Sequence, residues 1–252
     1  MPVLAIDTAT EICSIALGEA GGTIHELNLE AGRSHLEVLL PGVNSLLGEL
    51  GIEPGGLDCI VVGTGPGTFS GLRVGIATAR ALAQALRKPL AGASTLLALA
   101  WGMTAPGAAG GAGPEAAAKE PNEFILPVID AKRGQVFTQI FQKKDGVLEE
   151  VTPIMCLHPE AISEWIIRGT DLPVLTAGNG ALAHFDLLAG MEQLRLLPQE
   201  DRRHLVRAAG HLAACDHKAA YRPEELLKVL PVYVREPDAD KTVLLRKREL
   251  WQ

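Results

Sequence analysis

The stretch VLAIDTATEICSIAL, residues 3–17, decides the fold, because residues 124–141 repeat its pattern as FILPVIDAKRGQVFTQIF. Each stretch places an apolar strand before an aspartate, Asp7 or Asp130, and continues through a short polar turn into a second strand. Two such hairpins of similar length, far apart in one chain, indicate an internal duplication. We therefore expect two lobes with a common α/β architecture.

The first hundred residues alternate between strand and helix patterns. Residues 23–29 alternate apolar and polar side chains, so they extend the first hairpin into an antiparallel meander of three strands. Further strands are expected at residues 59–62 and 89–92, each followed by a helix. The predicted order of this lobe is β-β-β-α-β-α-β-α, with the last two helices at residues 71–86 and 94–101.

Residues 34–50 carry the strongest helix signal of the chain. Ser34 and Glu37 have the spacing of a capping box, and Gly51 follows as a stop signal. The apolar residues are predicted to lie on one stripe that faces the core. They are Leu36, Leu39, Leu40, Val43, Leu46, Leu47 and Leu50.

Composition divides the chain into four segments. Residues 102–122 are almost entirely glycine, alanine, proline and charged residues, so we expect a mobile connection that folding does not require. It would separate an N-terminal lobe, residues 1–101, from a C-terminal lobe, residues 123–235. In the C-terminal lobe we expect a strand at 174–176 and a helix at 203–216. A charged tail, residues 236–252, would end the chain.

The net charge of −7 argues against independent binding to tRNA or DNA, since most nucleic-acid affinity comes from neutralising phosphates with basic side chains. Four scattered cysteines without a CxxC spacing predict reduced thiols rather than a disulfide framework. The first residues have no basic segment, and no apolar run reaches the length of a membrane span. These features favour a cytoplasmic protein without a membrane partner.

Residues 63–75, GTGPGTFSGLRVG, have the strand–glycine loop–helix layout that can hold an anion. A P-loop would end in Gly-Lys-Ser/Thr, but this loop has no lysine, and Ser70 and Arg73 are the nearest substitutes. Glycines also allow a tight turn to pass beneath another segment. On the motif alone, a structural turn is the favoured interpretation.

Other polar groups give weaker signals. Asp7, Thr8 and Thr10 could hold a metal-bound phosphate or simply satisfy the turn's own N–H groups. His35 has no second histidine at metal-binding spacing, so a position near the helix cap or at the surface is favoured. His211 and Cys215 are four residues apart, but a pair without further ligands is usually incidental. We predict no metal site and no catalytic residue.

Five stretches, in this order and spacing, resemble the TsaB family, which carries the older label glycoprotease-like. The family resemblance implies the two-lobed fold of actin, Hsp70 and the sugar kinases, with a reduced second lobe. It covers residues 3–137 strongly and the remainder thinly. The stretches are AIDTATEICSIAL, RSHLEVLLPGV, GTGPGTFSGLRVGIATARALA, STLLALA and IDAKRGQVF.

The resemblance also implies a function. TsaB proteins are reduced, non-catalytic relatives of the catalytic subunit TsaD, with which they dimerise, and the ATPase TsaE joins the pair. The complex transfers a threonylcarbamoyl group to the adenosine beside the anticodon of tRNA. The expected chain is therefore no enzyme on its own, contacts tRNA only through the complex, and can form a homodimer when isolated.

Two sets of residues follow from the resemblance. No cofactor is expected to bind tightly, although ATP or ADP at the subunit junction would lie near the first set. The nucleotide-proximal set is Asp7, Thr8, Thr10, Gly65, Gly67, Thr68, Arg73 and Asp130. The partner-interface set is His35, Val38, Leu39, Gly71, Val74, Ala77, Thr78 and Ala81.

Two alternatives remain open at this level. A sugar-kinase-like phosphotransferase could use Asp7 and Asp130 to hold Mg²⁺–ATP, and micromolar ATP binding without a partner would favour it. A metallopeptidase, as the older label suggests, is disfavoured because no HExxH motif or other histidine pair occurs.

Overall fold

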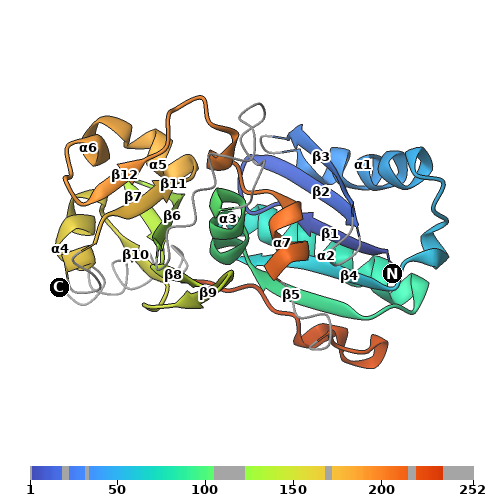
Figure 1. The fold of residues 1–252 in the computed structure, drawn as a ribbon. Helices are drawn as coiled ribbons and strands as arrows, with labels where there is room; N and C mark the ends of the chain where they lie inside the picture. The colour runs from blue at the N-terminus through green and yellow to red at the C-terminus, as the bar shows by residue number, and fades with distance from the viewer. Residues whose placement is uncertain are drawn as a thin grey trace, which may run out of the picture.

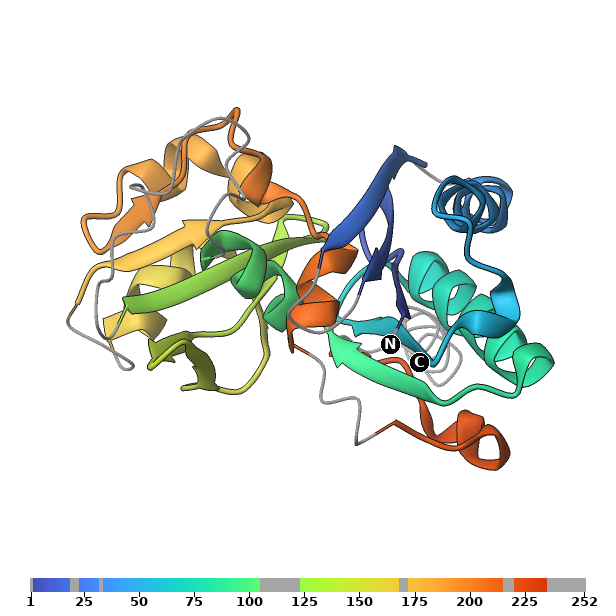
Figure 2. The ribbon, with the colours of Figure 1, turned by 45° about the vertical axis from the view of Figure 1, so that its right-hand side comes forward.

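The computed structural model describes residues 2–18, 23–31, 34–104, 123–167, 172–214 and 220–234. Figure 1 shows two lobes side by side, each built around a β-sheet, with α3 (Thr95–Thr104) and α7 (Ala208–Ala214) between them. The same arrangement is visible after the molecule is turned (Figure 2). Two helices from distant parts of the chain therefore form the junction of the lobes.

The sheet of the N-terminal lobe has the strand order β3-β2-β1-β4-β5. The first three strands pair antiparallel, and β4 and β5 add in parallel, as the alternation of strands and helices predicts. The strands are β1 (Val3–Asp7), β2 (Ile12–Gly18), β3 (Ile24–Glu30), β4 (Cys59–Gly65) and β5 (Leu90–Ser94).

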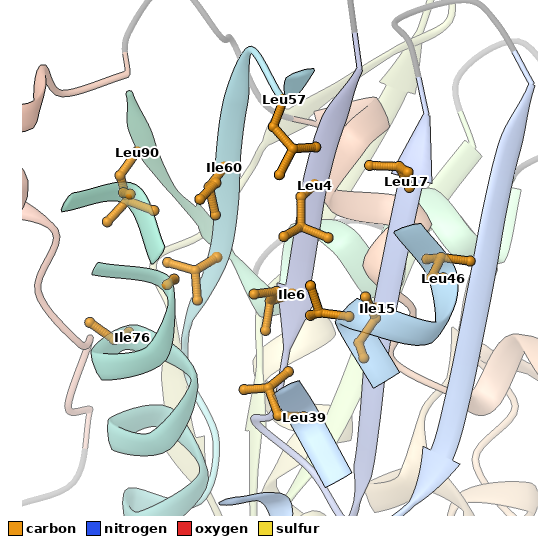
Figure 3. Packing of buried hydrophobic residues seen from close by; sticks show 14 of the residues in the cluster. Leu4, Ile6, Ile15, Leu17, Leu39, Leu46, Leu57, Ile60, Ile76 and Leu90 are labelled. Atoms are coloured by element: carbon orange, nitrogen blue, oxygen red, sulfur yellow. The ribbon is translucent and has the colours of Figure 1, made fainter. Parts of the chain in front are cut away.

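Alternating side chains of β1 point to opposite faces of the sheet, and each face packs in a separate apolar core. Leu4 and Ile6 face α1 (His35–Glu49) and α2 (Phe69–Leu86), and Figure 3 shows them among apolar side chains from these helices. Val3 and Ala5 face the other side, where they pack with residues of α7. The sheet is therefore covered on both faces, and the predicted order of this lobe is confirmed.

Helix α1 confirms most of the predicted core-facing stripe but not its first turns, since the buried residues of the stripe are Leu39, Val43, Leu46 and Leu47. Leu36 is 72% exposed and Leu40 is 44% exposed, whereas His35 and Leu39 are buried. The face that carries Gly42 lies against the sheet, since a Cβ there would lie 2.6 Å from Ile15 Cδ1. Ser34 makes no side-chain cap, so the predicted capping box is wrong.

The sheet of the C-terminal lobe repeats the topology of the first, in the order β10-β7-β6-β11-β12. Its first three strands are again antiparallel and its last two again parallel. A hairpin of β8 (Phe141–Lys144) and β9 (Val147–Glu150) is added beside β6. The shared strands are β6 (Glu123–Lys132), β7 (Gln135–Thr138), β10 (Met155–Leu157), β11 (Val174–Ala177) and β12 (Leu194–Leu196).

The helices of this second lobe are short, which makes it the reduced copy. They are α4 (Ile162–Ile167), α5 (Asn179–Ala183) and α6 (Phe185–Ala189), with 3₁₀ turns at Pro159–Ala161 and Arg202–His204. The duplication that the two hairpins predict is thus confirmed by matching sheet topologies. This two-lobed α/β arrangement agrees with the fold that the family resemblance implies.

The lobe boundaries differ from those drawn on composition. Helix α3 continues to Thr104, and α7 begins at Ala208 rather than at residue 203. From α7 onward the chain returns to the first lobe, where the 3₁₀ segment Pro223–Lys228 packs on α2 and Val232 N–H donates to the Thr64 carbonyl at 2.8 Å. Residues 102–104 of the predicted connection belong to α3, and its remainder, 105–122, and the tail at 236–252 lie outside the described residues.

Candidate functional site

Asp7 ends β1 at the centre of the N-terminal lobe, and its carboxylate is fully buried. Oδ1 accepts the Ala9 N–H at 2.8 Å. Oδ2 accepts the Thr95 hydroxyl at 3.2 Å and lies 2.6 Å from Nε2 of His211, which is also fully buried. Both oxygens are therefore engaged by groups of the chain itself.

The glycines of residues 63–75 fit closely around this turn. A Cβ on Gly63 would lie 2.1 Å from Asp7 Oδ2, one on Gly67 would lie 2.5 Å from the Ala9 carbonyl, and one on Gly71 would lie 2.0 Å from the Thr8 carbonyl. No side chain fits at such distances without a shift of the backbone. The glycines thus allow β4 and α2 to pack directly on the turn, which supports the structural interpretation of the loop.

The hydroxyls of the turn also bind within the lobe. Thr8 Oγ1 donates to the Gly71 carbonyl at 2.8 Å, and Thr10 Oγ1 accepts the Ile12 N–H at 3.3 Å. The Thr68 N–H donates to the Ala9 carbonyl at 2.8 Å, and Gly65 takes a φ of 108°, which favours glycine. The predicted nucleotide-proximal residues of this lobe are therefore brought together, apart from Arg73, but mainly to bind one another.

Asp130 repeats the Asp7 turn in the C-terminal lobe. Its Oδ1 accepts the Lys132 N–H at 2.7 Å, as Asp7 Oδ1 accepts the N–H two residues later. Asp130 is only partly buried, however, and its Oδ2 pairs with Lys132 Nζ at 2.6 Å. The two lobes thus share a turn geometry but not its surroundings.

The surroundings of these turns raise the pKa values of two side chains. Burial, followed by the charge of Asp7, raises the pKa of the Cys13 thiol to about 12, so this thiol stays protonated at neutral pH. The hydrogen bond to Asp130 raises the pKa of Lys132. Neither group is prepared for nucleophilic or acid–base chemistry near neutral pH.

Arg73 points away from the Asp7 turn. Its guanidinium lies 3.7 Å from the centre of the Phe69 ring, and its Nε lies 3.4 Å from the Tyr233 hydroxyl. The Phe69 and Tyr233 rings are 5.2 Å apart, and both are about half exposed. Arg73 therefore belongs to an exposed aromatic cluster at the start of α2, which no pattern in the sequence predicts.

The expected partner residues fall into two groups. His35, Leu39 and Gly71 are buried, so they have no surface for a partner and are withdrawn from the expected interface. Ala77 and Ala81 are exposed, while Val38, Val74 and Thr78 are partly exposed. Leu36 and Leu40, which had been expected in the core, share the exposed side of α1.

The role of His211 was missed, because it lies 204 residues from Asp7 in the sequence. The spacing of His211 and Cys215, judged incidental from the sequence, cannot be followed, since Cys215 lies outside the described residues. Within the parts of the chain that are described, no cluster of three or more His, Cys, Asp or Glu side chains has the geometry of a metal site. Nor does any described helix combine the length and apolar character needed to span a bilayer.

Known proteins match this chain over most of its length. The family model described as TsaD: tRNA N6-adenosine threonylcarbamoyltransferase matches residues 18–181. The tRNA threonylcarbamoyladenosine biosynthesis protein TsaB of Bacillus subtilis is 32% identical over 190 residues, which cover 75% of each chain. The TsaB protein of Escherichia coli is 32% identical over 179 residues, or 68% of this chain and 71% of the relative.

A solved structure agrees with these matches. YeaZ from Pseudomonas aeruginosa has a TM-score of 0.67 and 28% sequence identity, with 92% of this chain and 99% of that chain covered. The likeness thus includes the second lobe, where the sequence motifs are sparse. The chain belongs to the TsaB family.

Proposed function

We propose that this protein is a non-catalytic subunit in tRNA threonylcarbamoyladenosine biosynthesis, and that it acts by pairing with a TsaD-type catalytic subunit. Membership of the TsaB family supports a role in this modification. The family model that matches this chain is named after the transferase, yet the Asp7 turn of this chain is filled by its own Thr95 and His211. This combination supports a related but separate catalytic partner.

One observation carries the proposal: helices α1 and α2 contact each other, and each of them leaves apolar side chains exposed. On α2 the exposed residues Phe69, Arg73, Ala77, Ala81 and Ala85 recur every four positions, so they form one stripe along the helix. On α1, Leu36 and Leu40 are exposed. We call these seven residues the α1–α2 face.

The α1–α2 face has the chemistry of a helix-packing surface. Small side chains at Ala77 and Ala81 allow another helix to approach to 8–10 Å, and the exposed leucines supply apolar area. Exposed apolar patches on proteins that are otherwise polar at the surface commonly mark binding sites. The first proposed occupant is the TsaD-type subunit. A second copy of this chain would take its place when the partner is absent.

Size-exclusion chromatography with the TsaD-type subunit of the same organism tests this proposal. Ala77→Arg and Ala81→Glu should weaken the complex by roughly 100-fold or more, since a long charged side chain would be buried at a helix crossing. Val147→Arg is the matched control, because Val147 is 58% exposed on β9 of the other lobe. Wild-type assembly by both α2 variants, with unchanged circular dichroism, would overturn the proposal.

The finer parts of the function are further proposals. We propose that a TsaE-type ATPase joins the heterodimer, that ATP or ADP binds at the subunit junction, and that tRNA is held by the complex rather than by this chain. The net charge of −7 supports the last point. Filter binding of labelled tRNA to the chain alone and to the complex tests it, with retention expected only for the complex.

A further inference from the structure

Residues 204–211 connect the two lobes through a buried histidine at each end. His204 lies 1% exposed against the C-terminal lobe, and His211 lies 0% exposed against the N-terminal lobe. Neither histidine lies on the α1–α2 face through which the protein is proposed to bind its partner. The segment passes through the junction of the lobes, beside α3 (Figure 1).

His204 is fixed to the end of β11. The Gly178 N–H donates to His204 Nδ1 at 3.0 Å, so Nδ1 is the acceptor and the ring proton is on Nε2. Nε2 lies 3.0 Å from the Pro198 carbonyl and 3.3 Å from the Leu197 carbonyl, where it can donate. The imidazole therefore joins two loops of the C-terminal lobe and has a partner for both nitrogens.

His211 is fixed to the end of β1. Its Nε2 donates to Asp7 Oδ2 at 2.6 Å in a site that excludes water. Its Nδ1 has no hydrogen-bond partner among the described residues, so the contact with Asp7 is the one that orients the ring. The buried contact lies at the centre of the lobe, beneath Gly63.

The residues between the two histidines are held by polar side chains of the first sheet. The Ala208 N–H donates to Ser14 Oγ at 2.8 Å, and the Ala209 N–H donates to Glu26 Oε1 at 3.0 Å. Arg207 Nε donates to Glu26 Oε2 at 2.6 Å. Gly210 passes so close to α3 that a Cβ there would lie 2.2 Å from the Ala98 carbonyl.

We propose that residues 204–211 form an interlobe latch that holds the two lobes in one orientation without a bound ligand. Helix α3 also packs on β6 through apolar side chains such as Leu96 and Leu99, but lobes of one chain ordinarily move relative to each other unless further contacts fix their orientation. A further polar contact between the lobes, Asn179 Nδ2 to the Glu11 carboxylate at 3.0 Å, is exposed and therefore weak. Loss of either histidine frees the lobes to rotate, while each sheet stays folded.

Hydrogen–deuterium exchange and small-angle X-ray scattering of the whole chain test the latch. The variants are His204→Ala, His211→Ala and the milder His211→Gln, with His158→Ala as control, since His158 is exposed and its ring lies 3.1 Å from the Gly134 carbonyl of its own lobe. In the latch variants, amides at 174–180 and 204–212 should exchange roughly ten-fold faster or more. Strands β1, β4 and β6 should keep their protection, and the radius of gyration should increase.

Two results would overturn the proposal. Equal acceleration of exchange in the sheets and at the junction would show that the histidines stabilise the fold as a whole. Unchanged exchange and scattering in His204→Ala and in both His211 variants would show that other contacts hold the lobes. Failure of all three variants to fold would also contradict it, because a latch joins lobes that fold without it.

Discussion

The turns at Asp7 and Asp130 come from one duplicated hairpin, yet they have different roles in the molecule. Each aspartate ends a strand and accepts the N–H two residues later, at 2.8 Å and 2.7 Å. Asp7 is then enclosed by Gly63, Thr95 and His211, whereas Asp130 is partly exposed and pairs with a lysine of its own turn. A shared backbone motif therefore does not determine a shared function, because segments far away in the sequence decide what surrounds it.

Asp7→Ala should separate the two turns most strongly. Removal of a buried partner leaves His211 and Thr95 unsatisfied, so we expect a loss of about 3–5 kcal/mol in the free energy of unfolding. Asp130→Ala should cost about 1 kcal/mol, since its ion pair is solvated. Urea unfolding at 25 °C measures both losses, and similar values for the two variants would contradict the comparison.

Gly71→Ala should disturb the packing of α2 on the Asp7 turn. A Cβ there would lie 2.0 Å from the Thr8 carbonyl, so the backbone must move, and we expect a loss of about 1–3 kcal/mol. Gly48→Ala is the matched control in α1, because a Cβ at Gly48 meets no atom within 4 Å. It should stabilise the protein by about 0.5–1 kcal/mol through helix propensity. Equal effects of the two alanines in thermal unfolding would contradict this assignment.

Asp201→Asn should weaken the segment that leads to His204. Asp201 accepts the Arg203 N–H at 2.9 Å and pairs with its guanidinium, which lowers the pKa of Asp201. A lowered pKa stabilises the fold above the ordinary aspartate value of about 3.9, and this contribution is lost as the pH falls through the folded-state value. Asp201→Asn should therefore lower the free energy of unfolding by about 1 kcal/mol at pH 7 and by almost nothing near pH 2. If the difference in the free energy of unfolding between the variant and the wild type did not change with pH, the assigned ion pair would be refuted.

Lys132→Met should have the smallest effect. The Lys132 side chain is 61% exposed, so its pair with Asp130 should contribute less than about 0.5 kcal/mol. The hydrogen bond to Asp130 raises the pKa of Lys132, so the contribution is fully present below the unfolded-state pKa of about 10.4 and is lost as the pH rises through the raised folded-state pKa. Unfolding in low and high salt measures it, and a large, salt-independent loss would mean that this turn is as enclosed as the Asp7 turn.

Local patterns in the sequence predicted the order of strands and helices in the first lobe and the duplication, because each hairpin carries its own alternation and turn residues. They did not predict that Leu36 and Leu40 of α1 are exposed. Its seven apolar residues at i, i+3 and i+4 spacings cover a wide arc, and the close approach of Gly42 to Ile15 decides the orientation. That contact joins a helix to a strand and leaves no periodic signal.

The Asp7 site was half predictable for the same reason. Thr8, Gly67 and Thr68 lie in two motifs whose residue types predict a turn and a glycine loop. The structure brings these two motifs together. His211 closes the site from the far end of the chain, and no spacing rule relates residues 204 positions apart. Side-chain composition therefore identifies such a site, but only tertiary packing shows whether it is open or filled.

Isothermal titration calorimetry with the TsaD-type subunit, over a range of temperatures, tests the central claim most directly. If the α1–α2 face is the binding surface, wild-type protein should form a one-to-one complex with a clearly negative heat-capacity change, the mark of apolar burial. Ala77→Arg should abolish the measured heat of binding, and Val147→Arg should bind with the same heat and heat-capacity change as the wild type. Absence of binding by the wild type, or equal binding and heat-capacity change for Ala77→Arg, would contradict the account.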